Sequence, residues 1–411
     1  MATRRGGAVT VNGRSYAWPD RPLVVMCIDG CEPDYVRQAT TAGAMPYLAQ
    51  ALPGGTERLA DCVVPSFTNP NNLSIVTGVP PAVHGICGNY FFDRDAGAEV
   101  MMNDPRYLRC GTILAAFSRE GARVAVVTAK DKLRALLGHG MSGVCFSAEK
   151  ADRTTAAEHG VADGLGLAGM PLPSVYSAEL SEFVFAAGVK LLESTRPEIM
   201  YLSTTDYVQH KHAPGSAEAN EVYGMMDGYL AKLAGLGATL AITADHGMNA
   251  KTDATGHPRV IYLQDVLDEW LGPAQARVIL PITDPYVVHH GALGSFATVY
   301  LPAGTDAEQI RERVSALPGM EVVLGREAGC RRFELPPDRV GDLIAVSERH
   351  VVIGTSGARH DLSGLDAPLR SHGGISEQRV PLLLSRPTPG VPADQRLRNF
   401  DVFDLALNHV A

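Results

Sequence analysis

The chain has 411 residues, of which 45% are hydrophobic and 20% are charged, and its formal net charge is −9. This length suits two or three domains, or one large domain with an insertion, and the composition excludes a disordered chain. The longest apolar runs fall short of the roughly 18 residues that a membrane span needs. The acidic balance provides no basic surface for nucleic acid or anionic lipid. An anionic ligand would therefore have to be attracted locally.

The cysteine content and the N-terminal residues bear on the expected compartment. Seven cysteines are an odd number, and they are scattered through a chain long enough to fold without disulfides. The first twenty residues contain no apolar run of the kind found in a signal peptide. We therefore expect reduced thiols and a cytoplasmic protein.

Four short apolar runs, taken in chain order, each stop abruptly at a polar residue. They are LVVMCI before Asp29, RVAVVTA before Lys130, IMYLSTT before Asp206 and TLAITA before Asp245. Runs of this kind are typical of strands buried on both faces of a parallel sheet, and the amphipathic stretches between them suit crossover helices. The sequence predicts an α/β fold with a mainly parallel sheet flanked by helices. Ligands of such folds bind beyond the carboxyl ends of the strands.

After His246 the chain becomes richer in proline and glycine. Residues 285–302 alternate like an antiparallel strand pair, residues 306–319 resemble a helix, and residues 320–335 resemble another strand. We predict a smaller α+β insertion at 254–368, with the main core formed by 1–253 and 369–411.

Asp206 and His210 stand four residues apart in TTDYVQHKH. If the preceding strand passes into a helical turn, both side chains face the same way. A carboxylate and an imidazole on one face are common zinc ligands, although an ordinary contact between them on a helix has the same spacing. The pair is a candidate metal site.

Asp245 and His246 directly follow a buried strand and precede a glycine that lets the backbone turn. They could be metal ligands, or they could be a helix cap and a hydrogen-bonded core histidine. His372 precedes two glycines where the chain is expected to re-enter the core. On its own this histidine indicates little.

Asp29 ends the first predicted strand, and Thr68 lies in PSFTNPNN, where a helix is expected to begin. A hydroxyl at a helix N-terminus lies among free N–H groups that can hold a phosphate, although a plain threonine cap fits the same pattern. Together, three aspartates, three histidines and this threonine supply seven ligands. That number is enough for two zinc ions with room left for a substrate.

The ordered set of these motifs resembles the alkaline phosphatase superfamily over nearly the whole chain. The motifs are IDG, PSFTNPNN, TTDYVQHKHAPG, TADHGMN and SHGG, and the residues around them resemble the phosphonoacetate hydrolases of that superfamily. The resemblance implies an alkaline-phosphatase-like core with a cap insertion at 254–368 and two Zn²⁺ per chain. It implies that one zinc is held by Asp206, His210 and His372, and the other by Asp29, Thr68, Asp245 and His246.

The resemblance also implies how a substrate is held. Lys130 and Lys132 would bind a carboxylate and Asn89 a phosphoryl oxygen, although solvated lysines are an equally ordinary interpretation. Thr68, activated by zinc, would attack phosphorus and form a phospho-threonine. Breaking a C–P bond expels a carbanion, which is tolerable when its charge spreads into an adjacent carbonyl group held by cations. The expected reaction is hydrolysis of phosphonoacetate to acetate and phosphate.

Other functions fit parts of this pattern. A phosphodiesterase or phosphomonoesterase would use the same core, because the metals hold the phosphoryl group whichever leaving group is attached. A cofactor-independent phosphoglycerate mutase carries a serine where Thr68 stands. A non-catalytic zinc protein would close its sites with four ligands, whereas a three-ligand site favours catalysis. The expected partner is a small anionic phosphonate, and the sequence leaves a homodimer open.

Three further histidines are given no catalytic role. His212 is expected near the first metal without being a ligand. His289 and His290 could line a lid or cap a strand, and we favour the strand because adjacent strand residues point to opposite faces.

Overall fold

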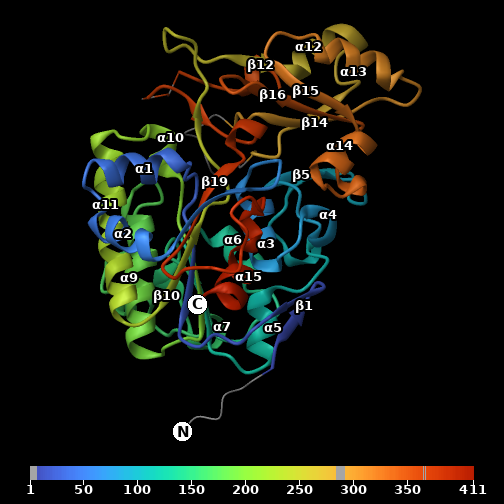
Figure 1. Ribbon diagram of the computed structural model, residues 1–411. Helices are drawn as coiled ribbons and strands as arrows, with labels where there is room; N and C mark the ends of the chain where they lie inside the picture. The colour runs from blue at the N-terminus through green and yellow to red at the C-terminus, as the bar shows by residue number, and fades with distance from the viewer. Residues whose placement is uncertain (1–6, 284–291, 364, 366) are drawn as a thin grey trace.

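The computed structural model describes residues 7–283, 292–363, 365 and 367–411. Its centre is an eight-stranded sheet in the order β20-β4-β19-β10-β3-β9-β7-β8 (Figure 1). The strands are β3 (Leu23–Cys27), β4 (Thr56–Asp61), β7 (Val124–Thr128), β8 (Val144–Ser147), β9 (Ile199–Ser203), β10 (Thr239–Thr243), β19 (Arg379–Leu384) and β20 (Leu397–Arg398).

Five neighbouring strands of this sheet, β10, β3, β9, β7 and β8, run parallel. Strand β19 is antiparallel to both β10 and β4. Every residue of β3, β7, β9 and β10 is buried, as expected of strands covered on both faces. The predicted α/β fold with a mainly parallel sheet is confirmed.

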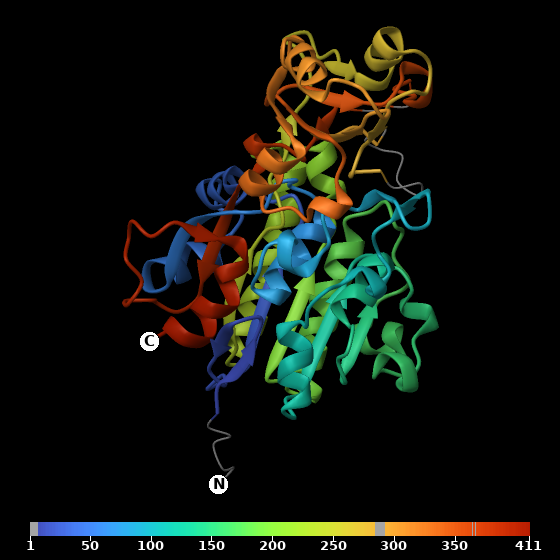
Figure 2. The same cartoon turned by 90° about the vertical axis from the view of Figure 1, so that its right-hand side faces the viewer.

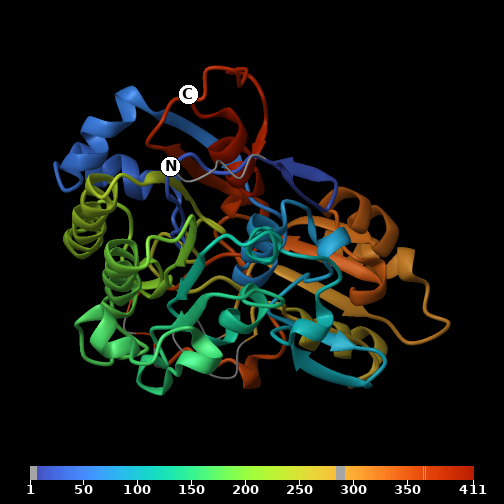
Figure 3. The same ribbon diagram turned by 90° about the horizontal axis from the view of Figure 1, so that it is seen from below.

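Helices pack on both faces of the sheet (Figures 1 and 3). One layer contains α1 (Pro33–Thr41), α2 (Pro46–Ala51), α9 (Glu179–Ser194) and α11 (Ala217–Gly235). The other contains α3 (Thr68–Thr77), α5 (Ile113–Arg119), α6 (Asp131–Leu137) and α15 (Val402–Asp404). The amphipathic stretches of the sequence form α2, α5, α9 and α11, as predicted.

A second, smaller sheet lies beyond the carboxyl ends of the central strands (Figure 2). Its order is β13-β14-β16-β15, with all neighbours antiparallel. The strands are β13 (Arg277–Ile279), β14 (Phe296–Tyr300), β15 (Met320–Gly325) and β16 (Leu343–Ser347), and the helices near them are α12 (Leu263–Leu271), α13 (Ala307–Ser315) and α14 (Arg326–Phe333). A parallel pair, β12 (Val260–Tyr262) with β17 (Val352–Gly354), belongs to the same part.

The expectation of one strand over 320–335 was wrong in its second half. Strand β15 ends at Gly325, and the following residues form α14. The alternating apolar pattern stops at Gly325, and Gly329, Cys330 and Phe333 are then buried at helical spacing. Part of the strand pair predicted at 285–302 lies outside the described residues. Its second half is β14, which pairs with β13 and β16 instead.

The remaining elements are short. They include the hairpins β1 (Val9–Val11) with β2 (Arg14–Tyr16) and β5 (Tyr90–Asp93) with β6 (Ala98–Met101), the strand pair β11 (Asn249–Ala250) with β18 (Arg370–Ser371), and the helices α4 (Pro81–His84), α7 (Ala156–His159), α8 (Gly164–Ala168) and α10 (Tyr207–Lys211). All seven cysteines are free thiols. Within the described part of the chain, no helix has the length and apolar character needed to cross a bilayer.

Candidate active site

The carboxyl ends of four parallel strands lie level with one another at one edge of the sheet. In the strand register, Cys27 on β3 lies opposite Ser203 on β9 and Thr243 on β10, and Thr128 on β7 also lies opposite Ser203. The polar residues that follow these strands therefore gather at this edge. They are Asp29, Lys130, Asp206 and Asp245.

Asp206 caps the short helix α10, which brings His210 onto the same side. The Asp206 Oδ2 atom lies 2.9 Å from His210 Nε2 and 3.7 Å from His372 Nε2. All three side chains are buried. The helical turn expected from the four-residue spacing is therefore present, and His372 joins the pair from the C-terminal part of the chain.

A second buried group surrounds His246. Its Nε2 atom lies 3.2 Å from Asp29 Oδ1 and 3.9 Å from Asp245 Oδ2. One ligand atom from each of these three residues lies within 4.8 Å of the others, and the same holds for the trio of Asp206, His246 and His372. His246 thus belongs to two compact donor groups, and His210 adjoins them through Asp206.

The three histidine rings are oriented by backbone carbonyls. Nδ1 of His210, His246 and His372 lies 2.8–2.9 Å from the carbonyl oxygens of Arg370, Gly247 and Ser66, respectively. Because a carbonyl only accepts hydrogen bonds, each Nδ1 carries the proton. Nε2 is then the atom that each ring presents to the carboxylates, which is the arrangement that metal-ligating histidines commonly use.

The carboxylates at this edge are crowded and buried. Burial and the nearby Asp206 and Asp245 charges raise the pKa of Asp29 well above its usual value. Burial opposes ionisation of Asp206, but the neighbouring histidines outweigh it and hold the pKa of Asp206 well below its usual range. Burial likewise lowers the pKa of His246, yet Asp245 and Asp29 raise it to about 10. Because the carboxylates are close together and buried, a cation between them is strongly favoured.

The donor chemistry fits divalent metal ions. Asp29 Oδ1 and His246 Nε2 are buried and have no hydrogen-bond partner among the described residues. The lone pair of an imidazole nitrogen and a carboxylate oxygen repel each other unless a proton or a metal ion lies between them. Carboxylate oxygens with imidazole nitrogens are a common donor set for zinc.

Thr68 reaches the same edge from the opposite side, as the first residue of α3. It is partly exposed, whereas the rest of the helix is buried. Its own N–H has no acceptor in the described part of the chain. A hydroxyl and an unpaired N–H at a helix start offer a nucleophile and an anion-binding donor together.

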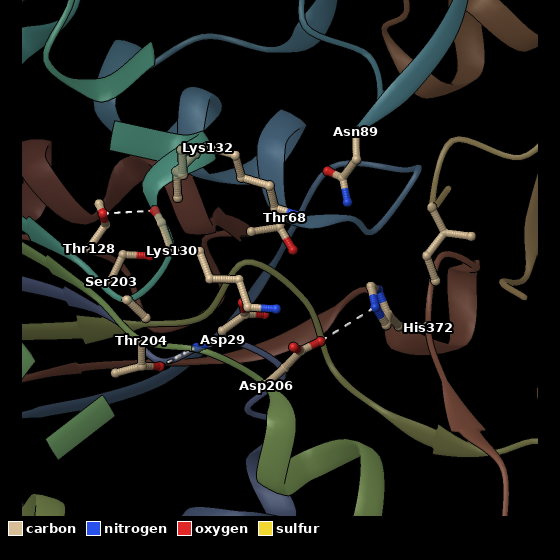
Figure 4. A pocket seen from close by; sticks show the side chains of 13 residues that line it. Asp29, Thr68, Asn89, Thr128, Lys130, Lys132, Ser203, Thr204, Asp206 and His372 are labelled. Carbon is tan, nitrogen blue, oxygen red and sulfur yellow. Dashed lines mark hydrogen bonds and ion pairs between the residues drawn. The ribbon is translucent and has the colours of Figure 1, made fainter. Parts of the chain in front are cut away.

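A pocket opens over these residues (Figure 4). The sequence-predicted residues that line it are Asp29, Thr68, Asn89, Lys130, Lys132, Asp206 and His372. His210, Asp245 and His246 lie beneath it in the buried cluster. The fold thus brings all ten predicted site residues to one edge of the sheet.

The two lysines and Asn89 line this pocket together with Thr68. Lys130 caps helix α6, and no carboxylate pairs with its ammonium among the described residues. Figure 4 shows Lys132 directed towards Thr68. Asn89 accepts the Asn69 N–H through Oδ1 at 2.9 Å, which leaves its Nδ2 donors for the pocket.

The sequence prediction missed several residues of this site. Thr128, Ser203 and Thr204 also line the pocket, and the Thr204 hydroxyl accepts the backbone N–H of Asp29 at 3.0 Å. Their position at the ends of β7 and β9 was a usable signal. Asn72 and Arg370 also contact the cluster, through Asp245 and His210, respectively. Neither follows a predicted strand, so the sequence contained no indication of either contact.

Three further histidines had been given no catalytic role. His212 Nδ1 lies 3.6 Å from Glu218 Oε2, and His212 does not line the pocket over Thr68. His289 and His290 fall outside the described residues.

Comparison with known proteins identifies a family and a relative of full length. A family model described as type I phosphodiesterase / nucleotide pyrophosphatase matches residues 23–374. The crystal structure of phosphonoacetate hydrolase from Sinorhizobium meliloti 1021 in complex with phosphonoacetate has 61% sequence identity and a TM-score of 0.95, over 99% of this chain and 100% of that chain. The phosphonoformate complex of that enzyme gives a TM-score of 0.96.

Two further relatives are more limited. Human ectonucleotide pyrophosphatase / phosphodiesterase 5 is 18% identical with a TM-score of 0.65, over 95% of this chain and 96% of that chain, and shares the fold. A phosphonoacetate hydrolase from Penicillium oxalicum is 56% identical over 46 residues, which are 10% of this chain and 64% of that relative. The chain thus spans less than two thirds of the fungal relative. The full-length likenesses confirm the predicted alkaline-phosphatase-like fold.

Proposed function

The chain belongs to the type I phosphodiesterase / nucleotide pyrophosphatase family and, within it, to the phosphonoacetate hydrolases, and from this premise we propose that it hydrolyses phosphonoacetate to acetate and phosphate. The observation that carries the proposal is the shared pocket, which Thr68 lines together with Lys130 and Lys132. A substrate with a phosphoryl group at one end and a carboxylate at the other matches a pocket that holds a hydroxyl nucleophile and two ammonium groups.

We propose that the buried cluster of carboxylates and histidines holds two zinc ions. One would be held by Asp206, His210 and His372, and the other by Asp29, Thr68, Asp245 and His246. When bound, these ions would neutralise phosphoryl oxygens and lower the pKa of the Thr68 hydroxyl.

The chain's own residues account for the rest of the reaction. The Thr68 hydroxyl gives up its proton and its oxygen bonds to phosphorus as the C–P bond breaks, and the electron pair of that bond moves onto the methylene carbon and into the carboxylate. Lys130 and Lys132 stabilise that charge, while the Asn89 amide and the Thr68 N–H hold phosphoryl oxygens. The carbanion takes up a proton to become acetate. Water then displaces Thr68 from phosphorus, which releases phosphate and restores the hydroxyl.

Two further proposals concern the role of residues 254–368 and the location of the protein. We propose that residues 254–368 form a cap over the pocket, because Ile282 from this segment lines it together with Thr68. We also propose a cytoplasmic location, because all seven cysteines are free thiols.

The deciding experiment is phosphate release by the purified, zinc-loaded protein. Phosphonoacetate would be compared with methylphosphonate, phosphonopyruvate, p-nitrophenyl phosphate and a phosphate bis-ester. Release from phosphonoacetate with inert methylphosphonate supports the proposal, because methylphosphonate has no carbonyl group to accept the carbanion charge. Preference for an ester would instead indicate a phosphodiesterase or phosphatase and remove the role given to the two lysines.

A further inference from the structure

Asn72 lies behind the pocket, between the nucleophile and the metal cluster. It is the fifth residue of α3, is fully buried and does not line the pocket. Its Nδ2 donates to the Thr68 carbonyl at 3.1 Å and to Asp245 Oδ2 at 3.1 Å. A single side-chain amide therefore connects the first turn of α3 to the end of β10.

The orientation of this amide follows from its partners. A backbone carbonyl and a carboxylate both only accept hydrogen bonds, so the NH₂ end must face Thr68 and Asp245. The oxygen end accepts from the Tyr201 hydroxyl at 2.7 Å and the Ser203 hydroxyl at 3.1 Å. All four hydrogen-bonding positions of Asn72 are used, and the amide cannot turn without breaking them.

The contact also fixes the Asp245 carboxylate. Its Oδ1 accepts the backbone N–H groups of Gly30 at 3.3 Å and His246 at 3.1 Å, while Oδ2 is held by Asn72. Rotation of the carboxylate would break bonds at both oxygens. The direction in which Asp245 presents its remaining lone pairs is thus set by Asn72 together with two backbone groups.

We propose that Asn72 is a positioning residue that fixes the Thr68 nucleophile relative to the metal ligand Asp245. This inference rests on the proposed function and deepens it. Asn72 touches neither substrate nor metal, but partners that orient a ligating carboxylate affect metal affinity and rate strongly. Aspartate at this position would replace two donors with a further negative charge beside Asp245, whereas alanine would leave both acceptors without the amide.

The neighbouring Asn71 offers a matched control. It is equally buried in the same helix, and its amide bonds only to backbone groups and to Asn399. Replacing it removes a comparable set of hydrogen bonds without touching Asp245. A merely structural role for Asn72 would make the two alanine variants alike.

The experiment compares Asn72→Asp, Asn72→Ala and Asn71→Ala. Zinc affinity is measured by competition with a chromophoric chelator, and kcat and KM are measured with phosphonoacetate. We expect both Asn72 variants to bind the weaker zinc about 10–100-fold less tightly than wild type, with a lower kcat and a KM close to wild type. Asn71→Ala should lower thermal stability and leave zinc affinity at the wild-type value.

A milder pair of variants covers the case in which Asn72 variants do not fold. Tyr201→Phe removes one hydroxyl that holds the Asn72 amide, and Tyr16→Phe changes a buried tyrosine near the C-terminal end of α3. We expect weaker zinc binding and a lower kcat only in Tyr201→Phe.

Wild-type zinc affinity in the Asn72 variants, with a kcat no lower than that of Asn71→Ala, would overturn the inference. A wild-type protein that releases no phosphate from phosphonoacetate would refute the proposed function, and the zinc titration would still decide the role of Asn72.

Discussion

The ring of His246 lies parallel to the ring of His372, with the centroids 3.6 Å apart and the planes at 6°. Each ring is oriented by its own backbone carbonyl, at Gly247 and Ser66, respectively. The stack places imidazoles from the two proposed metal sites in direct contact. Loss of one metal should therefore disturb the ligands of the other.

Chelation should consequently reduce activity and stability together. Removal of zinc leaves buried aspartates without a compensating cation, and a ligand at about 100 times its Kd contributes about 2.7 kcal/mol to the free energy of unfolding. We expect dialysis against a chelator to abolish phosphate release and lower Tm by several degrees, and zinc to restore both. Calorimetry with and without chelator measures this, and an unchanged Tm would argue against a metal in the cluster.

Thr68→Ala should separate chemistry from folding. The side chain is partly exposed at the start of α3, so its loss removes little packing. We expect a folded protein that still binds zinc, with kcat lower by more than about 1,000-fold, because a lost nucleophile removes the covalent route. Thr68→Ser keeps the hydroxyl and serves as the control. Near wild-type rates in Thr68→Ala would exclude this residue as the nucleophile.

The lysine pair should affect one substrate class selectively. Replacing Lys130 and Lys132 by alanine is expected to raise KM for phosphonoacetate far more than for p-nitrophenyl phosphate, which has no carboxylate to lose contact with. Lys190→Ala, at an exposed lysine paired with Glu193, is the control for general charge. Steady-state kinetics with both substrates measure the ratio, and equal effects would mean that the lysines do not recognise a carboxylate.

Arg370 is expected to act on the first metal site through the backbone. Its Nε donates to the Gln209 carbonyl at 2.8 Å, and its own carbonyl accepts from His210 Nδ1. Arg370→Met should therefore loosen His210 and weaken zinc binding about 10-fold or more. The zinc competition assay measures this loss. Arg386→Met, at a partly buried arginine that pairs with Asp20, should change nothing in that assay.

Local sequence was sufficient where the chemistry lies next to a strand. A continuous apolar run that stops at a polar residue predicts both the strand and the edge, and this placed Asp29, Asp206 and Asp245 correctly. The four-residue spacing of Asp206 and His210 predicted that both side chains lie on one side of a helical turn, for the same reason. These patterns depend only on neighbouring residues, so no knowledge of tertiary contacts was needed.

Long-range polar contacts could not be predicted in this way. Asn72 bonds to Asp245, 173 residues away, and Arg370 bonds to Gln209, 161 residues away. Nothing in the residues around either one distinguishes it from an ordinary polar residue. The helix at 326–333 was also missed, because a single strand pattern was extended past Gly325. Such features depend on which elements the fold brings together.

Breaking a buried ion pair outside the proposed metal site should destabilise the fold. Lys251 and Glu377 are both fully buried, with Nζ 2.9 Å from Oε1, and Lys251 also donates to the Arg349 carbonyl at 2.7 Å. Lys251→Met leaves the Glu377 charge without its cation, which typically costs about 3–5 kcal/mol. The double variant Lys251→Met, Glu377→Gln should recover most of that loss. Urea unfolding at pH 7 measures both, and equal stability of the single variant and wild type would contradict the expectation.

The same pair predicts a pH dependence with a definite sign. Burial alone would raise the pKa of Glu377, but the Lys251 charge outweighs it and the pKa lies below the ordinary value of 4.5. A carboxyl whose pKa is lower in the folded state stabilises the fold above its unfolded pKa and loses that contribution as pH falls through the folded one. The stability of the wild type relative to the double variant should therefore be constant near neutral pH and decline below about pH 4.5. Urea titrations of both proteins between pH 3 and pH 7 test this, because the other carboxylates contribute equally to each. A difference that grows as the pH falls would show that Glu377 is protonated in the native pair.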